Sequence, residues 1–234
     1  MLVDVRTTVI DRLTSSPVAA LLALAGVAAG VLVGHGGLDT VVGCGIPSDS
    51  HPSRTAEDWV ANADHVVVAT PTAEQDTNRR NFAKGPIQYR TDRAVTFRAD
   101  KVLWSSPSPR QQIGQDFDMV SAGWNVYRDS GKRTKRTTAA APRLEPGHTY
   151  LLALRWASGQ WVVLGEGAAV PFDDQTVGQG EWCGRTLSKE DVARGERFSR
   201  KDDHSLEKAV HGQDEQAVTR ELERARTESR ARGR

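Results

Sequence analysis

The stretch that decides the fold runs from Arg143 to Asp174 and reads RLEPGHTYLLALRWASGQWVVLGEGAAVPFDD. Two apolar segments, 150–156 and 160–164, flank a short turn that contains a glycine, which is the pattern of a β-hairpin. This is the strongest strand–turn–strand signal in the chain. Every other β segment needs it as a pairing partner.

The upstream segments also have strand patterns. Residues 66–70 are apolar and β-branched, which is typical of a buried strand. In the long segment 91–104 the apolar phase begins on Val95 and Phe97 and then slips to Val102 and Trp104. A slip of one residue predicts a β-bulge, which bends a long strand around a barrel corner.

A third upstream segment and two helical segments complete the pattern. In residues 116–119, Phe117 and Met119 alternate with two aspartates, so both should point inward. Thr55 and Asp58 have the spacing of a capping box before a short helix. Beyond Leu187 the chain is highly charged with nearly balanced sign. Its thin apolar stripe predicts a charged helical tail that is only partly docked.

This element count favours a mainly β fold, a five-stranded OB-like partly open barrel with a short N-terminal helix and a charged C-terminal helical tail. An immunoglobulin-like sandwich needs about seven strands and fits less well. Two polar segments, Glu74–Arg90 and Asn125–Pro142, are predicted to be loops.

The N-terminal segment determines the compartment. Residues 17–34 carry no charge, and a helix of this length spans roughly 27 Å, enough for a bilayer core. Arg6 and Arg12 precede it, whereas acidic residues outnumber basic ones after it. This bias predicts a single-pass cell-membrane protein with a cytoplasmic N-terminus and an extracytoplasmic main domain. A cleaved signal peptide would make the protein secreted. A lipoprotein signal would anchor it by lipid at Cys44, although Asp39 lies where such signals stay uncharged.

The predicted organisation therefore has five parts. They are a cytoplasmic N-terminus (1–16), a transmembrane helix (17–34), a linker (35–54), an OB-like β domain (55–186) and a charged helical tail (187–234). The two cysteines, Cys44 and Cys183, would then face an oxidising space, which predicts a disulfide between them. The sequence has no CxxC pair or Cys/His cluster of the kind that structural zinc sites use.

Four segments resemble a known family. Residues 63–70, ADHVVVAT after a short helix, resemble the "SDVVVVGTV" opening of bacterial extracytoplasmic domains. Those domains are similar in fold to the tissue inhibitors of metalloproteinases and to netrin modules. Residues 95–104 and 144–154 resemble their "V-x-F-x-V-x-x-V-L-K-G" and "L-x-x-G-x-x-Y-L-L-F-L" strands, and residues 161–172 resemble their closing strand. About half of the chain is covered.

The resemblance implies an OB-like fold, and most such domains have no known function. Ser105-Ser106-Pro107 replaces the expected Lys-Gly, so the register there departs from the pattern. The inhibitors act through a free N-terminal cysteine amine on zinc, whereas 43 residues precede Cys44 here. Inhibitor activity is therefore not expected.

Few residues suggest chemistry. The six histidines are scattered without an HExxH motif, and there is no GxSxG motif. We therefore predict no catalytic residue and no cofactor. Asp173 and Asp174 at a strand end are candidate metal ligands. The alternative, which is the commoner case, is that they are exposed strand-end carboxylates that bind no metal. A basic run is a candidate contact for an anionic polymer or for lipid headgroups. The alternative is that it is a solvated loop without a ligand. Its members are Arg128, Lys132, Arg133, Lys135 and Arg136.

The sequence thus favours a non-catalytic binding or interaction module of the cell envelope. Its partners would be the membrane, through the N-terminal helix, and an envelope protein or anionic polymer. Nucleic acid is not expected, because the domain is predicted to lie outside the cell and the net charge is only +1. Two alternatives stay open: an envelope hydrolase whose site is assembled from loops, and a regulatory partner that acts through the C-terminal helix.

Overall fold

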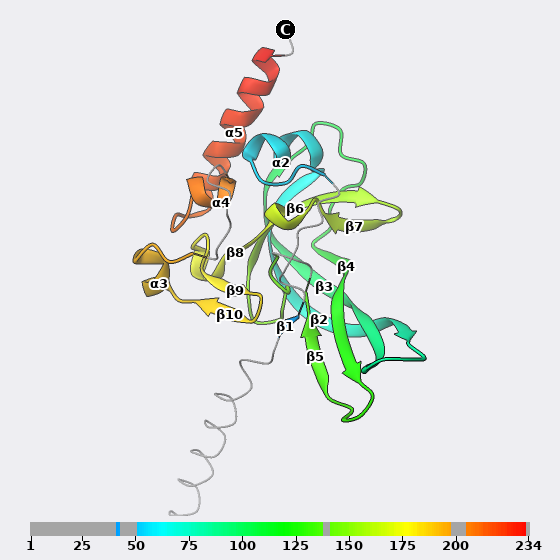
Figure 1. Cartoon of the computed structure of the whole chain (residues 1–234). Helices are drawn as coiled ribbons and strands as arrows, with labels where there is room; N and C mark the ends of the chain where they lie inside the picture. The colour runs from blue at the N-terminus through cyan, green and yellow to red at the C-terminus, as the bar shows by residue number, and fades with distance from the viewer. Residues whose placement is uncertain (1–40, 43–50, 138–140, 198–204, 233–234) are drawn as a thin grey trace, which may run out of the picture. The chain divides into compact units, whose positions relative to one another are not determined.

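The computed structural model describes residues 41–42, 51–137, 141–197 and 205–232 (Figure 1). The predicted transmembrane helix and Cys44 lie outside these residues. Within the described part of the chain, no helix is long and apolar enough to cross a membrane.

The domain is mainly β, with helices before and after the sheet-forming region. The strands are β1 (Val41–Val42), β2 (His65–Asn81), β3 (Ile87–Ser105), β4 (Asp116–Tyr127), β5 (Arg133–Arg136), β6 (Tyr150–Ala157), β7 (Gln160–Val163), β8 (Ala169–Pro171), β9 (Gly180–Trp182) and β10 (Arg185–Leu187). The helices are α2 (Ala56–Asn62), α3 (Lys189–Ala193), α4 (Leu206–Ala209) and α5 (Glu215–Arg232), with 3₁₀ turns η1 (Glu166–Ala168) and η2 (Asp173–Gln175).

Five strands form a closed barrel in the ring order β4-β3-β2-β6-β7. Neighbours are antiparallel except β4 and β7, which run parallel and meet at one pair, Met119 opposite Trp161. The expected barrel was partly open. It is closed because the four-residue strand β7 reaches β4 at this single pair. A five-stranded barrel with this connectivity is compatible with an OB-like fold.

The hairpin that dominates the sequence, β6–β7, is confirmed, and its strength as a signal has a structural cause. Both faces of β6 are buried. Leu152 and Leu154 point into the barrel, while Leu151 and Ala153 pack against the outer core. A strand buried on both faces is a continuous apolar run rather than an alternating one.

The outer core lies between the barrel and the helices. Trp59 of α2 is fully buried, and its indole Nε1 donates to the carbonyl oxygen of Ser53 at 2.7 Å. The capping box of Thr55 and Asp58 is present at the start of α2. The tail also contributes to this core, because Val218 and Leu222 of α5 are fully buried in it.

Asp64 joins α2, β6 and the loop after β3. Its carboxylate is 1% exposed and accepts hydrogen bonds from the backbone N–H of Arg110 at 2.9 Å and of Trp156 at 2.8 Å. Burial alone would raise the pKa of this carboxyl, but these hydrogen bonds and the nearby Arg110 guanidinium outweigh it and lower the pKa.

The predicted bulge in β3 is confirmed. Val68 pairs with Lys101 and Ala69 with Ala99, so Asp100 is the extra residue. Trp104 is buried as expected, but the expectation that Val102 points inward is wrong, because its side chain is 45% exposed. A second register shift, between Val66 and Val67, leaves Leu103 as an extra residue between Val102 and Trp104.

Two segments predicted to be loops are strands, which corrects the sequence interpretation. Residues 74–90 form the outer part of the β2–β3 hairpin, and residues 125–136 contain the end of β4 and all of β5. These strands extend beyond the barrel, where most of their side chains are exposed or only partly buried. They therefore carry no apolar alternation that could mark them in the sequence.

Candidate functional site

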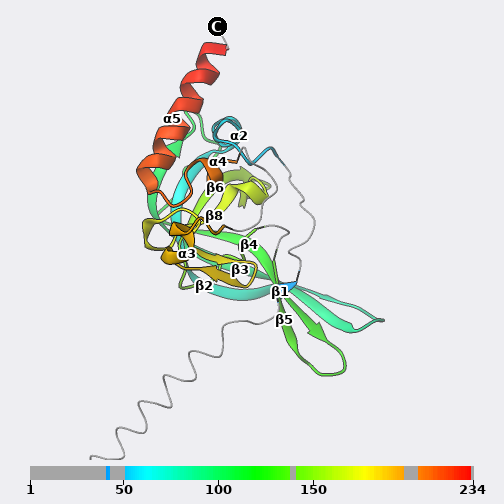
Figure 2. The ribbon, with the colours of Figure 1, turned by 60° about the vertical axis from the view of Figure 1, so that its left-hand side comes forward.

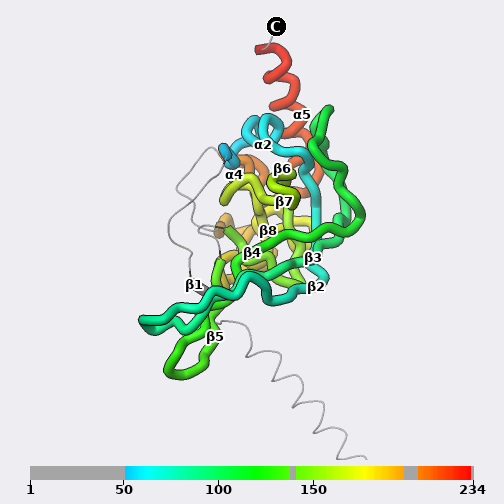
Figure 3. The backbone as a smooth tube through the Cα atoms, turned by 90° about the vertical axis from the view of Figure 1, so that its right-hand side faces the viewer, coloured from blue at the N-terminus to red at the C-terminus, as the bar shows by residue number. Residues whose placement is uncertain are grey.

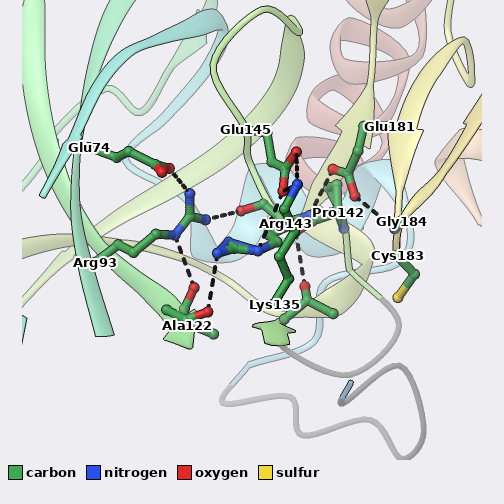
Figure 4. Close-up of polar contacts among 12 residues, drawn as sticks. Glu74, Arg93, Ala122, Lys135, Pro142, Arg143, Glu145, Glu181, Cys183 and Gly184 are labelled. Carbon is green, nitrogen blue, oxygen red and sulfur yellow. Dashed lines mark hydrogen bonds and ion pairs between the residues drawn. The ribbon is translucent and has the colours of Figure 1, made fainter. Parts of the chain in front are cut away.

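A buried arginine occupies the barrel end from which the two hairpins project. Arg93 stands two residues before Val95, in the phase of β3 that points inward, and its side chain is 1% exposed. Its Nε donates to the carbonyl oxygen of Ala122 on β4 at 3.0 Å. Its Nη1 pairs with Glu74 on β2, and its Nη2 donates to the carbonyl oxygen of Arg143 (Figure 4). One guanidinium thus holds three strands and a loop together.

A second buried arginine lies beside it. The Nη2 of Arg143 donates to the carbonyl oxygen of Gly123 at 3.1 Å, and its Nε lies 3.4 Å from Glu145 Oε1. Burial and the positive charge of Arg93 lower the pKa of Arg143 to about 10. Arg143 therefore remains a cation at neutral pH, next to another buried cation.

Buried acceptors complete this cluster. Glu181 is 4% exposed and accepts the backbone N–H of Arg143 at 2.8 Å and the hydroxyl of Tyr150 at 3.2 Å. Burial raises the pKa of Glu181 and raises that of Tyr150 well above its usual value. Tyr150 therefore stays protonated and donates a hydrogen bond to Glu181, while its oxygen accepts the N–H of Glu145 at 3.0 Å. The segment before β6 is fixed to β9 in this way.

Trp124 connects the buried cluster to the surface. The guanidinium carbon of Arg143 lies 4.5 Å from the centre of the Trp124 ring, and that of Arg133 on β5 lies 4.4 Å from it. A ring in contact with two guanidinium groups gains cation–π attraction from both. The β4–β5 hairpin is therefore packed onto the cluster rather than loosely hinged.

We call the two projecting hairpin ends the basic arm, defined as residues 78–90 of β2–β3 and residues 127–136 of β4–β5. Figures 2 and 3 show them projecting to the same side, at the end of the barrel away from α5. Residues 78–90 carry four basic side chains and no acidic one, and residues 127–136 carry five basic and one acidic. The whole chain has a net charge of only +1, so positive charge is concentrated here.

Contacts within the arm order its surface. Arg128 joins the two hairpins, because its backbone N–H donates to the carbonyl oxygen of Pro86 at 2.8 Å and its side chain donates to the carbonyl oxygens of Phe82 and Gly85. Arg79 stacks on Tyr89, with its guanidinium carbon 3.8 Å from the ring centre. The arm is thus a two-hairpin unit with its own side-chain packing.

The predicted anion contacts are brought together on the β4–β5 hairpin, but their charges are not equally available. Arg133 pairs with Asp76 at 2.7 Å, Lys135 with Glu145 at 2.9 Å, and Arg136 lies 3.5 Å from Asp92. The remaining two members of the predicted set, Arg128 and Lys132, are exposed on the arm.

Sequence reasoning missed the β2–β3 half of the arm. Arg80 and Lys84 are exposed there, and among the described residues neither they nor Lys132 form an ion pair with a carboxylate. Thirteen consecutive residues with four basic and no acidic side chains were the available signal.

Asp173 and Asp174, the candidate metal ligands, are in contact with protein donors. Asp173 accepts the backbone N–H of Thr149 at 2.7 Å and lies 2.6 Å from His148 Nδ1, which raises the pKa of His148. Asp174 accepts the amide of Gln179 at 2.7 Å. The described residues contain no group of three or more His, Cys, Asp or Glu side chains that could hold a metal ion.

Of the two cysteines of the predicted disulfide, Cys183 lies in the described part of the chain. Cys183 is half-buried in the turn between β9 and β10, and its Sγ lies 3.7 Å from the carbonyl oxygen of Ala141. Cys44 lies outside the described residues, so the pairing stays a prediction.

A cavity of about 230 Å³ lies beside the β4–β7 seam. Apolar residues such as Leu144, Trp161 and Val163 line much of it, and Glu166 at its edge pairs with Arg54 at 2.8 Å. No histidine or cysteine occurs among the described residues that line it. The described part of its lining therefore lacks the nucleophile–base pairs on which a Ser/His or Cys/His mechanism depends.

Comparison with known proteins adds no relative to this picture. No protein-family model matches the chain, and no curated protein matches it either.

Proposed function

We propose that this chain is a non-catalytic binding protein of the cell envelope, with an OB-like barrel that presents the basic arm to an anionic ligand. The observation that carries the proposal is a set of exposed basic residues, Arg80, Lys84 and Lys132, that pair with no carboxylate among the described residues. They lie on two hairpins that project to the same side (Figure 2). The fold adds an analogy, because OB-folds commonly bind ligands through the connection between their first two strands. Here that connection is the β2–β3 half of the arm.

Rigidity supports a binding role for the arm. A flexible basic loop must lose conformational freedom when it binds, whereas a preorganised surface avoids most of that cost. The guanidinium of Arg93, the Trp124 contact and the Arg128 hydrogen bonds all restrict the arm before any ligand arrives.

The same proposal places the domain outside the cell on a retained N-terminal anchor, residues 17–34, with a cytoplasmic N-terminus. The support is the apolar run and the charge bias around it. A tissue-inhibitor- or netrin-like version of the OB fold is supported by the strand motifs quoted above. We propose no inhibitor activity, because the retained anchor precedes Cys44, whose amine is then part of a peptide bond.

A Cys44–Cys183 disulfide is part of the proposal. β1 pairs in parallel with Lys135 and Arg136 of β5, and Cys44 follows β1 by two residues. Cys183 lies against Ala141, a few residues after β5. The chain-entropy model gives about 5 kcal/mol for closing so long a loop. Intact mass measured with and without reductant tests it, and a chain with two free thiols in its native host contradicts it.

The binding proposal is tested with the full chain in detergent and fluorescent inorganic polyphosphate as the probe, followed by anisotropy. We expect salt-sensitive binding that weakens roughly tenfold or more when Arg80→Glu and Lys84→Glu are combined. The matched control combines Arg224→Glu and Arg230→Glu on the exposed face of α5. If both double substitutions weaken binding equally, or if neither changes it, the arm is not the binding surface.

A further inference from the structure

The position of β1 limits where the arm can lie. The uncharged run ends at Gly34, and β1 begins at Val41. Seven Cα–Cα steps span at most roughly 25 Å. Because Val41 pairs with Lys135 across one strand spacing of about 5 Å, the chain tethers the base of the arm within roughly 30 Å of the end of the proposed anchor.

The charge on the arm is suited to a membrane surface. Each basic side chain within a Debye length of an anionic bilayer raises the binding equilibrium roughly fivefold. Arg80, Lys84 and Lys132 are exposed at the two hairpins and pair with no carboxylate in the part of the chain that the structure describes, and Arg128 and Arg79 are exposed beside them. Asp129 is the one acidic residue in the arm.

The apolar residues of the arm indicate contact without insertion. Phe82 and Tyr89 are partly buried, and each faces an arginine of the arm. The exposed large apolar side chains of the described residues, Val102 and Val120, lie outside the arm. Attraction of the arm to a bilayer would therefore be electrostatic and sensitive to salt.

We propose that the basic arm lies against the anionic lipid headgroups of the same membrane that holds the N-terminal anchor. This inference rests on the anchoring proposed above and names the ligand of the arm. It commits to headgroups rather than to a soluble polyanion, because tether length and charge act together only at the membrane surface. The barrel is then held at the bilayer by two contacts, the anchor and the arm.

Amine acetylation of the full chain in lipid nanodiscs, read residue by residue by mass spectrometry, tests this. Nanodiscs of phosphatidylcholine alone are compared with nanodiscs that also contain phosphatidylglycerol. We expect Lys84 and Lys132 to be acetylated at least roughly fivefold more slowly with the anionic lipid, and high salt to remove the difference. Lys189, exposed on α3, is the internal control and should not change.

Variants separate specific contact from general attraction. Arg80→Glu combined with Lys84→Glu should restore fast acetylation of Lys132 on the other hairpin, whereas Arg80→Lys combined with Lys84→Arg should keep the protection. The combined Arg224→Glu and Arg230→Glu substitutions on α5 should leave the protection of Lys132 from acetylation unchanged.

The failures are distinguishable. A chain that does not remain with the nanodiscs overturns the anchoring and this inference together. A chain that stays anchored but shows equal acetylation in both lipids overturns this inference alone. Protection of Lys84 and Lys132 by soluble polyphosphate but not by phosphatidylglycerol also overturns it, and leaves the arm as a polyanion site.

Discussion

Replacing Arg93 with methionine should destabilise the domain by about 3 kcal/mol. The change leaves two buried carbonyl oxygens, those of Ala122 and Arg143, without their donor, and each such loss costs about 1–3 kcal/mol. The lost ion pair adds little, because Glu74 is 34% exposed and is rehydrated by solvent. Relief of the repulsion between Arg93 and Arg143 offsets part of the loss.

Urea unfolding followed by tryptophan fluorescence measures this difference. The matched control is Arg98→Met on the same strand, because that side chain is 51% exposed and its ion pair with Asp100 is solvated. We expect the control to change the free energy of unfolding by less than about 0.5 kcal/mol. An Arg93→Met variant that loses less than about 1 kcal/mol, or no more than the control, would refute the view that Arg93 holds the barrel end together.

Three further changes test other parts of the structure. The hydrogen bond to Asp173 is the main cause that raises the pKa of His148. The stability that protonated His148 contributes is therefore fully present below about pH 6.5 and is lost as pH rises through the folded-state pKa. We expect His148→Gln to remove this pH dependence from unfolding free energies measured across that range. The pKa of Asp64 is lowered, so Asp64→Asn should cost roughly 2–4 kcal/mol of unfolding free energy at neutral pH. Chemical denaturation in acid should show the difference in unfolding free energy between wild type and variant becoming smaller as pH falls below about 3.9. Gly123→Ala should cost about 1–3 kcal/mol in the same assay, because a Cβ there would lie 2.6 Å from the carbonyl oxygen of Thr91, whereas the neighbouring Ser121→Ala change should have little effect.

The barrel was predictable from the sequence because its strands are defined by burial. Residues 150–154 are apolar at every position, since both faces of β6 are covered, and this made the hairpin at 150–163 the clearest element in the chain. The bulge at Asp100 was predictable too, because a register shift reverses the phase of the apolar residues on either side.

The basic arm was not predictable by the same reasoning. Its strands are held by backbone hydrogen bonds, by guanidinium groups on aromatic rings and by Arg128 across the two hairpins. None of these contacts imposes an alternation of apolar residues. For Arg93, the pattern places the residue but does not reveal its partners. It occupies the inward phase of β3 with Val95 and Phe97, but the presence of its partners, Glu74 and two carbonyl oxygens, depends on tertiary structure.

The buried cluster and the exposed arm place different demands on their charges. In the cluster, Arg93 and Arg143 are compensated by Glu74, Glu145 and Glu181, so their charges serve to fix the strands rather than to bind. Apolar residues would often give a more stable barrel end than buried ions. Directional hydrogen bonds, however, fix where β2, β3 and β4 leave the barrel, which a packed apolar cluster does less strictly. The exposed charges of the arm then keep a defined spacing, as recognition of an extended array of anionic groups requires.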